Sequence, residues 1–376
     1  MLRTNYAPRK DWAESVESLG FSFHTSKDAY WNEGVAYQFT AAEVDKLEDA
    51  TNELYRISLE AVDHVVANRR FREFQIPESA ENLIVRSWER RDPSLYGRFD
   101  LAYDGHGDPK LLEFNADTPT SLLEAAIVQW QWKSVTVPGS DQFNSIHERM
   151  VEAWKRAVPE NRILHLACYL QNEEDRRTVE YVQDTAIEAG LVTRKIDIAD
   201  IIWSERDGVF LDSDLTPIQY LFKLYPWEWL LKDEFSQFIP QSSTNFIEPA
   251  WKMILSNKAI LPLLWELFPE HPNLLPAFRN VRSLSGGDFV EKPILSREGS
   301  NVTIYSKGGV VEASEGDYGD NPKIYQARAT LPNFDGRNVV IGSWIVGDEA
   351  AGMGVREDRS LITNNNSPFA PHIFNE

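Results

Sequence analysis

A predicted hairpin that sets two acidic residues opposite each other is the first sign of chemistry in this sequence. Polar and apolar residues alternate on both sides of the turn-forming segment DGHGD at residues 104–108. Symmetric pairing about that turn places Asp100 opposite Glu113 and Arg98 opposite Asn115. Facing carboxylates repel each other unless a positive charge lies between them. The hairpin therefore predicts a site for a divalent cation, with the amide of Asn115 beside it.

The types of the predicted ligands favour magnesium. Carboxylate and amide oxygens are hard donors that suit Mg²⁺, which keeps positions for water and phosphate when only two or three side chains reach it. The same register pairs Phe99 with Phe114 and Leu101 with Leu112, so the other face of the ribbon is apolar. The alternative is a solvated acidic hairpin in which Arg98 neutralises a carboxylate, and the spacing alone does not choose between the two.

The segment after the hairpin predicts an anion site beside this metal. Thr118, Pro119 and Ser121 precede the run LLEAAIVQWQW, which predicts a helix capped by Thr118, with proline in its first turn, that extends to about Val135. Free backbone N–H groups and hydroxyls at the amino end of that helix would hold a carboxylate or a phosphate.

A second group of candidates lies in the last third of the chain. Lys292 is on a predicted strand that leads into a loop with hydroxyls and Gly299 at residues 295–299, and Lys258 lies where one predicted helix stops and another begins. A glycine-containing loop can fold over nucleotide phosphates while a lysine neutralises them, although many ordinary hairpins contain the same residues. With the acidic pair and Arg98, these lysines favour phosphoryl transfer. GxSxG, Walker A, GxGxxG and HExxH motifs do not occur.

The composition indicates a folded protein with a sizeable core. A chain of 376 residues can form two or three domains, or one large enzyme with an inserted lobe, and its 42% apolar content excludes disorder. No apolar run approaches the roughly 18 residues that span a bilayer, and the amino terminus lacks the apolar core of a secretory signal, so we expect no membrane partner. The single Cys168 is expected to be a buried structural thiol and fits a reducing cytoplasm. A net charge of −20 argues against nucleic acid and would favour a cationic partner such as a polyamine.

The elements that must position these candidates change in character along the chain. Residues 1–39 form an aromatic-rich, irregular entry, and a helix capped by Thr40 with Glu43 as its partner follows to Asn68. Strands at 163–170, 191–196, 208–211 and 218–224 alternate with a helix at 176–189, which is typical of an α/β sheet. The loop 171–175, which contains Glu174 and Asp175, follows the carboxyl end of a strand, where α/β sheets bind ligands. The alternative is a helix amino terminus in which acids stabilise the macrodipole.

The carboxyl-terminal part predicts helices from 248, a turn at 282–287, and strands on both sides of the loop 295–299. Further strands are expected at 323–330, 338–346 and 360–363, and a loop is expected at the end of the chain.

Several motifs in a fixed order resemble a known family. NADTPTSLLEA, SNKAILPLLWELFPEHPNLLPA, VEKPILSREGSN and IGSWIVGDEAAGMGVREDRSLI resemble the synthetase half of glutathionylspermidine synthetase/amidases, which are related to trypanothione synthetases, from about Tyr30 to Thr363. The resemblance implies a mixed α+β and α/β architecture: an ATP-grasp fold in permuted chain order with an inserted pre-ATP-grasp-like α/β domain. Residues 1–150 would form the first part of the ATP-grasp region with the metal hairpin, 151–245 the inserted substrate domain, and 246–376 the ATP-binding part. In these enzymes ATP phosphorylates a carboxylate, and an amine attacks the acyl phosphate.

The resemblance also implies roles for matching residues. Asp100, Glu113 and Asn115 would bind Mg²⁺, as two ions, while Arg98 would stabilise the transition state and Arg356 would neutralise the acyl phosphate. The implied ATP contacts are Lys258, Lys292, Glu298, Gly299, Gln326, Ala327, Arg328, Ala329, Leu361, Ile362 and Thr363, and the implied substrate contacts are Thr118, Ser121, Glu174 and Asp175, the last two holding substrate ammonium groups.

The sequence also departs from the family pattern. No amidase half with its Cys/His pair accompanies the motifs, Thr118 replaces a serine, and Leu224 stands where a threonine is expected. Losing a hydroxyl from a peptide-binding wall leaves a polar substrate group unpaired, at a cost of about 1–3 kcal/mol. We therefore expect a Mg²⁺- and ATP-dependent acid–amine ligase, with glutathione and spermidine left open as its acid and amine. Two alternatives remain: a non-catalytic ATP-binding regulator on the same fold, and a glycoside hydrolase that uses the paired acids.

Overall fold

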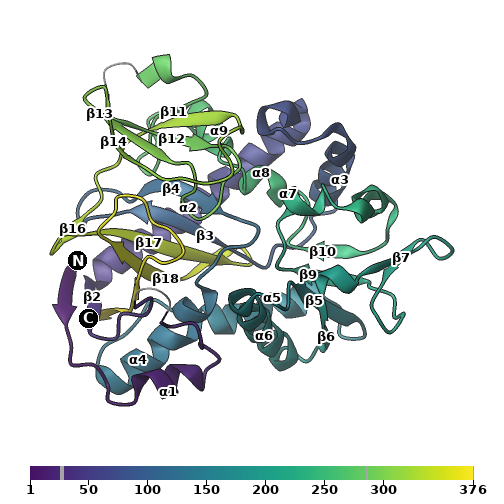
Figure 1. Ribbon diagram of the computed structural model, residues 1–376, viewed down its shortest axis with the longest axis horizontal. Coiled ribbons are helices and arrows are strands. Elements are labelled where there is room, and N and C mark those ends of the chain that lie inside the picture. The colour runs from purple at the N-terminus through teal and green to yellow at the C-terminus, as the bar shows by residue number, and fades with distance from the viewer. Residues whose placement is uncertain (26–28, 285–286, 376) are drawn as a thin grey trace.

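A six-stranded antiparallel sheet carries the predicted hairpin in the computed structural model, which describes residues 1–25, 29–284 and 287–375. The hairpin strands lie beside two long strands from the end of the chain (Figure 1), so segments more than two hundred residues apart become neighbours. Its strands are β3 (Tyr96–Ala102), β4 (Lys110–Asn115), β16 (Asn333–Phe334), β17 (Arg337–Val346), β18 (Glu349–Asp358) and β19 (Phe369–Ala370).

A second antiparallel sheet packs beside the hairpin and contains Lys292. Its strands follow the order β11 (Ala277–Phe278), β15 (Lys323–Ala327), β12 (Phe289–Pro293), β13 (Thr303–Ser306) and β14 (Gly309–Ala313). The predicted strands on both sides of the loop 295–299 are confirmed as the antiparallel pair β12 and β13. Figure 1 shows this sheet above the hairpin.

A parallel sheet of four strands confirms the predicted α/β alternation. Its strands follow the order β10 (Asn245–Ile247), β9 (Tyr220–Lys223), β5 (Ile163–Cys168) and β6 (Val192–Asp197). The helices α5 (Ile146–Ala157) and α6 (Glu173–Glu188) pack together, and α6 packs against β5 and β6. A small ribbon of β7 (Ile202–Ser204) and β8 (Val209–Leu211) and the short helix α7 (Trp227–Leu230) complete this part.

The long helix α2 (Ala41–Asn68) begins as predicted at a capping box. Thr40 accepts the backbone N–H of Glu43, whose side chain in turn accepts the N–H of Thr40. The buried face of α2 packs against β17, β18 and α9 (Ile260–Leu267). The helices α3 (Glu78–Glu89) and α8 (Lys252–Leu255) are also present, with the predicted break between α8 and α9.

The two ends of the described chain are not irregular, which corrects the prediction. Strand β1 (Leu2–Asn5) pairs with β2 (Val35–Thr40), and β2 pairs with β20 (His372–Asn375). A short helix, α1 (Trp12–Glu17), lies between β1 and β2. Figure 1 accordingly shows both termini on the same side of the molecule. These short strands are stable only through their distant partners, and local sequence does not reveal such pairing.

Two further local predictions are wrong or shifted, and a third extends beyond the described residues. The helix predicted from Pro119 begins at Leu122, contains a π-helical turn (Glu124–Val128) and continues as α4 (Gln129–Thr136). The segment 360–363 is a bend, because the Ser360 hydroxyl bonds the backbone of Ile362 and competes with strand pairing. In the predicted turn, Val281–Leu284 is a 3₁₀ turn, and residues 285 and 286 lie outside the described part.

Candidate active site

The hairpin pairs as predicted at its functional end. Arg98 lies opposite Asn115 and Asp100 opposite Glu113, but Leu101 lies opposite Leu111, so the predicted pairing with Leu112 is wrong. A register shift after Asp100 causes the difference. The backbone carbonyl of Leu112 accepts a hydrogen bond from Lys292 Nζ at 2.8 Å. The bulge therefore accompanies a contact to a distant strand that local sequence could not reveal.

The two carboxylates and the amide converge on one point. Asn115 Nδ2 donates to Asp100 Oδ2 and to Glu113 Oε1, each at 3.2 Å. Arg98 lies 6% exposed and binds both carboxylate oxygens of Asp100, with Nε at 2.7 Å and Nη2 at 3.1 Å. A Cβ at Gly342 would lie 2.8 Å from Arg98 Cδ, so the glycine leaves room for the arginine. The arginine is thus held rigidly beside the acids.

The two candidate lysines reach the same acids from the other side. Lys258 Nζ lies 3.4 Å from Glu113 Oε2 and donates to the Ser296 carbonyl at 2.7 Å. Lys292 Nζ donates to Gln326 Oε1 at 2.8 Å, besides its bond to the hairpin. Residues from the α8–α9 junction and from β12 and β15 therefore share one cleft with the hairpin.

The electrostatics of this cleft fix the charge of its central acid. Burial alone would raise the pKa of Glu113, but the charges of Lys258 and Lys292 outweigh it and hold that pKa at about 2. Burial lowers the pKa of Lys292 to about 8, with Lys258 acting in the same direction and Glu113 opposing. At neutral pH Glu113 is therefore anionic while Lys292 is still mostly protonated, a combination suited to a metal-bound phosphate.

Two adjoining cavities meet at the acids. A cavity of about 70 Å³ is mainly polar, and one of about 110 Å³ is bounded by apolar side chains of the second sheet. Both touch Asp100, Glu113, Gly299 and Thr363. The polar cavity is also lined by Arg98, Asn115, Thr118, Lys258, Arg297, Glu298 and Arg356; the apolar one by Val290, Lys292, Gln326, Ala327, Arg328, Ala329, Leu361 and Ile362.

The loop 295–299 borders both cavities and crosses to the hairpin side. Arg297 donates to the Thr118 hydroxyl and carbonyl, pairs with Glu228 at 3.4 Å, and lies over the Trp229 ring. Gly299 has φ +72°, and a Cβ there would lie 2.5 Å from the Thr363 carbonyl oxygen. Only glycine fits this close approach.

The residues that follow Asn115 do not form the predicted helix cap. Thr118 binds Arg297, the Thr120 carbonyl accepts Arg98 Nη1 at 2.6 Å, and Ser121 adopts φ +68°. The helix starts late because Thr118 and Thr120 bind two arginines, Arg297 and Arg98. Ser121 still borders a small cavity with Arg98 and Arg356.

An acidic cluster of Glu124, Glu174 and Asp175 lines neither cavity, but Glu174 is coupled by charge to Arg356 and Glu298, which line the polar one. Glu124 is 1% exposed on the π-helical turn and accepts the Tyr30 hydroxyl at 2.6 Å, while burial raises its pKa. Burial also raises the pKa of Glu174 to about 7, reinforced by Glu124, and that of Asp175 to about 6. The charge of Arg356 acts to lower the pKa of Glu174, and the charge of Arg297 acts to lower the pKa of Asp175. Glu174 and Asp175 lie in the first turn of α6, as the helix-terminus alternative requires, and the charges of Arg356 and Arg297 also act on them.

Sequence reasoning missed four residues of this site: Tyr30, Glu124, Glu228 and Arg297. Glu124 and Arg297 stand inside the quoted motifs NADTPTSLLEA and VEKPILSREGSN, and this signal could have identified them. Leu224 is buried and does not line either cavity.

The donor set fits Mg²⁺ that shares its coordination with phosphate. Within the described residues no group of three or more His, Cys, Asp or Glu is placed to hold a metal ion. Asp100, Glu113 and Asn115 supply two carboxylates and one amide, and Mg²⁺ usually binds one or two carboxylates together with water and substrate phosphates. No helix in the described ranges is both long and apolar enough to cross a bilayer.

Comparisons with known proteins agree on one family. Residues 3–375 match the family model described as "Glutathionylspermidine synthase preATP-grasp". A protein of Haemophilus influenzae named as an acid–amine ligase is 42% identical over 99% of this chain and 98% of its own length. A trypanothione synthetase of Crithidia fasciculata is 31% identical, and a bifunctional glutathionylspermidine synthetase/amidase of Escherichia coli is 29% identical. These two matches include 85% and 90% of this chain, but only 53% and 59% of the length of those longer proteins.

The fold is also found among solved structures. A glutathione synthetase-like effector from Globodera pallida aligns over 97% of this chain and 95% of its own, with a TM-score of 0.58 at 12% identity. This likeness concerns the mixed α/β architecture with several sheets.

Proposed function

Because this chain belongs to the glutathionylspermidine synthase family, we propose that it joins a carboxylate to an amine through an acyl phosphate formed with ATP. Its relatives are named as ligases and synthetases, and the chain is accordingly an ATP-dependent enzyme that forms amide bonds. Membership in a synthetase family also implies the use of ATP and Mg²⁺.

One observation carries the proposal more than any other. Lys258 pairs with Glu113 and the charge of Lys292 acts on the same carboxylate, although the hairpin and the lysines are far apart in the sequence. A solvated acidic hairpin would not need two partly buried cations from distant segments. A triphosphate with its metal needs both.

Each side chain then has a defined task. Asp100, Glu113 and Asn115 would hold Mg²⁺, as two ions, which when bound neutralises the triphosphate and orients it. Lys258 and Lys292 bind phosphate oxygens, while Arg98 and Arg356 stabilise the charge that develops on the transferring phosphoryl group. The remaining ATP contacts are Glu298 and Gly299 in the loop, Gln326, Ala327, Arg328 and Ala329 on and after β15, and Leu361, Ile362 and Thr363 in the bend that follows β18.

The two substrates bind at two separate groups of residues in this proposal. The acid lies beside Thr118, Ser121 and Arg297, whose donors can hold a carboxylate and the polar groups next to it. The amine lies beside Glu174 and Asp175, and Glu124 adds a third carboxylate for ammonium groups. Because relatives are named for glutathionylspermidine and trypanothione, a γ-glutamyl peptide and a polyamine are the first pair to test.

The proposal includes the organisation of the chain. Residues 1–150 and 246–376 would together form an ATP-grasp region in permuted order, with the pre-ATP-grasp-like domain 151–245 inserted between them. The parallel sheet β10-β9-β5-β6 and its helices support a separate substrate-binding unit.

Phosphate release over a panel of acids and amines tests the proposal. We expect ADP and phosphate only when Mg²⁺, an acid and an amine are all present, and a product whose mass equals the sum of both substrates minus water. Tight ATP binding with no acid- or amine-dependent turnover across carboxylates, γ-glutamyl peptides and polyamines would instead identify a regulator on the same fold. Hydrolysis of glycosides without ATP would identify a hydrolase.

A further inference from the structure

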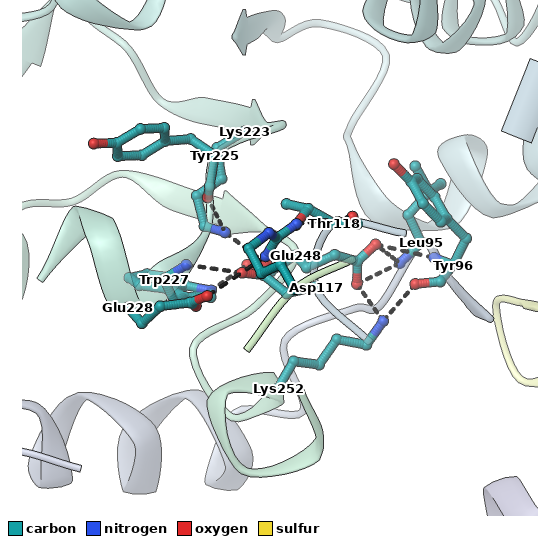
Figure 2. A network of polar contacts seen from close by, with 11 residues as sticks. Leu95, Tyr96, Asp117, Thr118, Lys223, Tyr225, Trp227, Glu228, Glu248 and Lys252 are labelled. Carbon is teal, nitrogen blue, oxygen red and sulfur yellow. Dashed lines mark hydrogen bonds and ion pairs between the residues drawn. The ribbon is translucent and has the colours of Figure 1, made fainter. Parts of the chain in front are cut away.

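A fully buried carboxylate ties the end of the metal hairpin to the parallel sheet. The side chain of Asp117 is 2% exposed, and its two oxygens accept Lys223 Nζ at 2.7 Å and the backbone N–H of Trp227 at 2.8 Å. Lys223 is completely buried and also donates to the Tyr225 carbonyl at 3.0 Å. Asp117 stands two residues after Asn115, so β4 is fixed to the end of β9 and the start of α7 (Figure 2).

A second buried ion pair continues this network to the other hairpin strand. The indole N–H of Trp227 donates to the Glu248 carbonyl at 3.1 Å. The Glu248 carboxylate accepts the N–H of Tyr96 at 2.9 Å and pairs with Lys252 at 2.6 Å, and Lys252 donates to the Tyr96 carbonyl at 2.6 Å. Neither Glu248 nor Lys252 exposes its side chain. Figure 2 shows both ion pairs and the hydrogen bonds that join Trp227 to Asp117 and to Glu248.

The network therefore holds both strands of the hairpin at the same end. Because β3 and β4 are antiparallel, Tyr96 and Asp117 flank the end at which Arg98 and Asn115 pair. The helix α7, which begins at Trp227, also carries Glu228, which contacts Arg297 of the loop bordering the cleft. By contrast, neither candidate ATP lysine bonds to any member of this network in the described part of the chain.

Two buried ion pairs are a poor way to gain stability alone. Desolvation of both charges often cancels their attraction, and apolar residues of similar volume can stabilise a fold equally well. A satisfied polar network instead fixes one geometry, since each donor and acceptor has a single place. The network joins the hairpin end that carries Arg98 to α7, whose Glu228 contacts Arg297, and this position suits that task.

We propose that Asp117 and Glu248 are positioning residues of the ligase reaction, which set Arg98 and the turn after Asn115 against the substrate domain. The inference rests on the proposed function. It predicts a division of roles. The network controls the rate of the chemical step, whereas Lys258 and Lys292 control the affinity for the nucleotide.

The variant Asp117→Asn tests this division. Asparagine keeps an acceptor for the Trp227 N–H but loses the charge that pairs with Lys223. We expect the Kd of Mg²⁺-ATP to stay within about twofold of the wild type, while kcat falls about tenfold or more, a loss of roughly 1.4 kcal/mol in the transition state. The matched control is Asp212→Asn, because the side chain of Asp212 is also 2% exposed and its partners, His165 and Arg194, line neither cavity. The control should lose a similar amount of thermal stability and keep its kcat.

The double variant Asp117→Asn with Lys223→Met separates the positioning role of Asp117 from the cost of a buried, unpaired charge on Lys223. Removal of both charges should restore thermal stability without restoring kcat. Equal kcat in Asp117→Asn and Asp212→Asn, or recovery of kcat in the double variant, would overturn the inference.

Amide hydrogen exchange gives a readout that does not depend on activity. Asp117→Asn should speed exchange in residues 95–100 and 115–121 but not in 289–306, and Asp212→Asn should change neither. If the wild type shows no acid- and amine-dependent turnover, the proposed function fails, whereas unchanged exchange at the hairpin end would overturn the network itself.

Discussion

The charge of a single residue, Glu113, decides what the cleft can bind. Two lysines outweigh the effect of burial and keep its pKa at about 2, so the carboxylate is ionised throughout the physiological range. Because the group is anionic and bonded to Asn115, it presents a fixed oxygen to a cation.

Replacing Glu113 by Gln should therefore abolish Mg²⁺-dependent ATP turnover while the fold persists. The amide has the same shape but lacks the charge, and loss of one preorganised electrostatic group typically costs 10²–10³ in kcat. Turnover and the melting temperature are measured on the same preparation. The control is Glu291→Gln, since Glu291 pairs with Lys323 on a neighbouring strand and lines neither cavity. Turnover near the wild-type rate in Glu113→Gln would refute the metal assignment.

The raised pKa of Glu174 predicts a pH dependence of amine binding. Burial and the charge of Glu124 raise this pKa to about 7, so the fraction of ionised Glu174 falls as the pH drops from 8 to 6. A protonated carboxyl cannot pair with an ammonium group, so KM for the amine should rise as the pH is lowered through this window.

Steady-state KM values for the amine between pH 6 and 8.5 check this prediction. Glu174→Gln should have a higher KM with a flatter pH profile. Glu173→Gln is the control, because Glu173 is exposed in the same helical turn and bonds Ser22. An unchanged profile in Glu174→Gln would show that the amine binds elsewhere.

At the scale of elements, the loop 295–299 depends on a close contact that only glycine permits. An alanine at Gly299 would place Cβ 2.5 Å from the Thr363 carbonyl oxygen, in addition to the cost of φ +72°. Gly308 has φ +78° with open space around it, and so shares the backbone cost of about 1–2 kcal/mol without the clash.

Gly299→Ala should raise KM for ATP about tenfold, whereas Gly308→Ala should change only the melting temperature. The loop cannot approach the bend 361–363 when the extra methyl group is present, and the apolar cavity would remain open. Initial rates at varied ATP measure the difference. The loop has no such role if both variants give the same KM.

The sequence could predict elements wherever the signal is local. The capping box at Thr40 and Glu43 located α2, and the alternation of the hairpin gave the register up to Asp100 and Glu113. The bulge after Asp100 could not be predicted, because it accompanies the bond from distant Lys292 to the Leu112 carbonyl. The late start of the helix at Leu122 has the same kind of cause, since arginines from other segments bind the backbone before it.

At the scale of the whole molecule, the site joins three distant parts of the chain. The hairpin, the segment 258–299 and the strands between 323 and 363 line adjoining cavities. Motif order identified their members, but it could not show that Arg297 crosses to Thr118 or that Tyr30 reaches Glu124, because such contacts exist only after folding. The strands at the two termini were missed for the same reason, because each pairs with a strand that is remote in the sequence.

The transfer of oxygen from the acid to phosphate tests the central claim most directly. An acid substrate labelled with ¹⁸O in its carboxylate is incubated with enzyme, Mg²⁺, ATP and the amine, and the released phosphate is examined by mass spectrometry. An acyl phosphate formed in the cleft of Glu113, Lys258 and Lys292 predicts that each phosphate carries one labelled oxygen from the acid. Unlabelled phosphate, or label in AMP, would contradict this account.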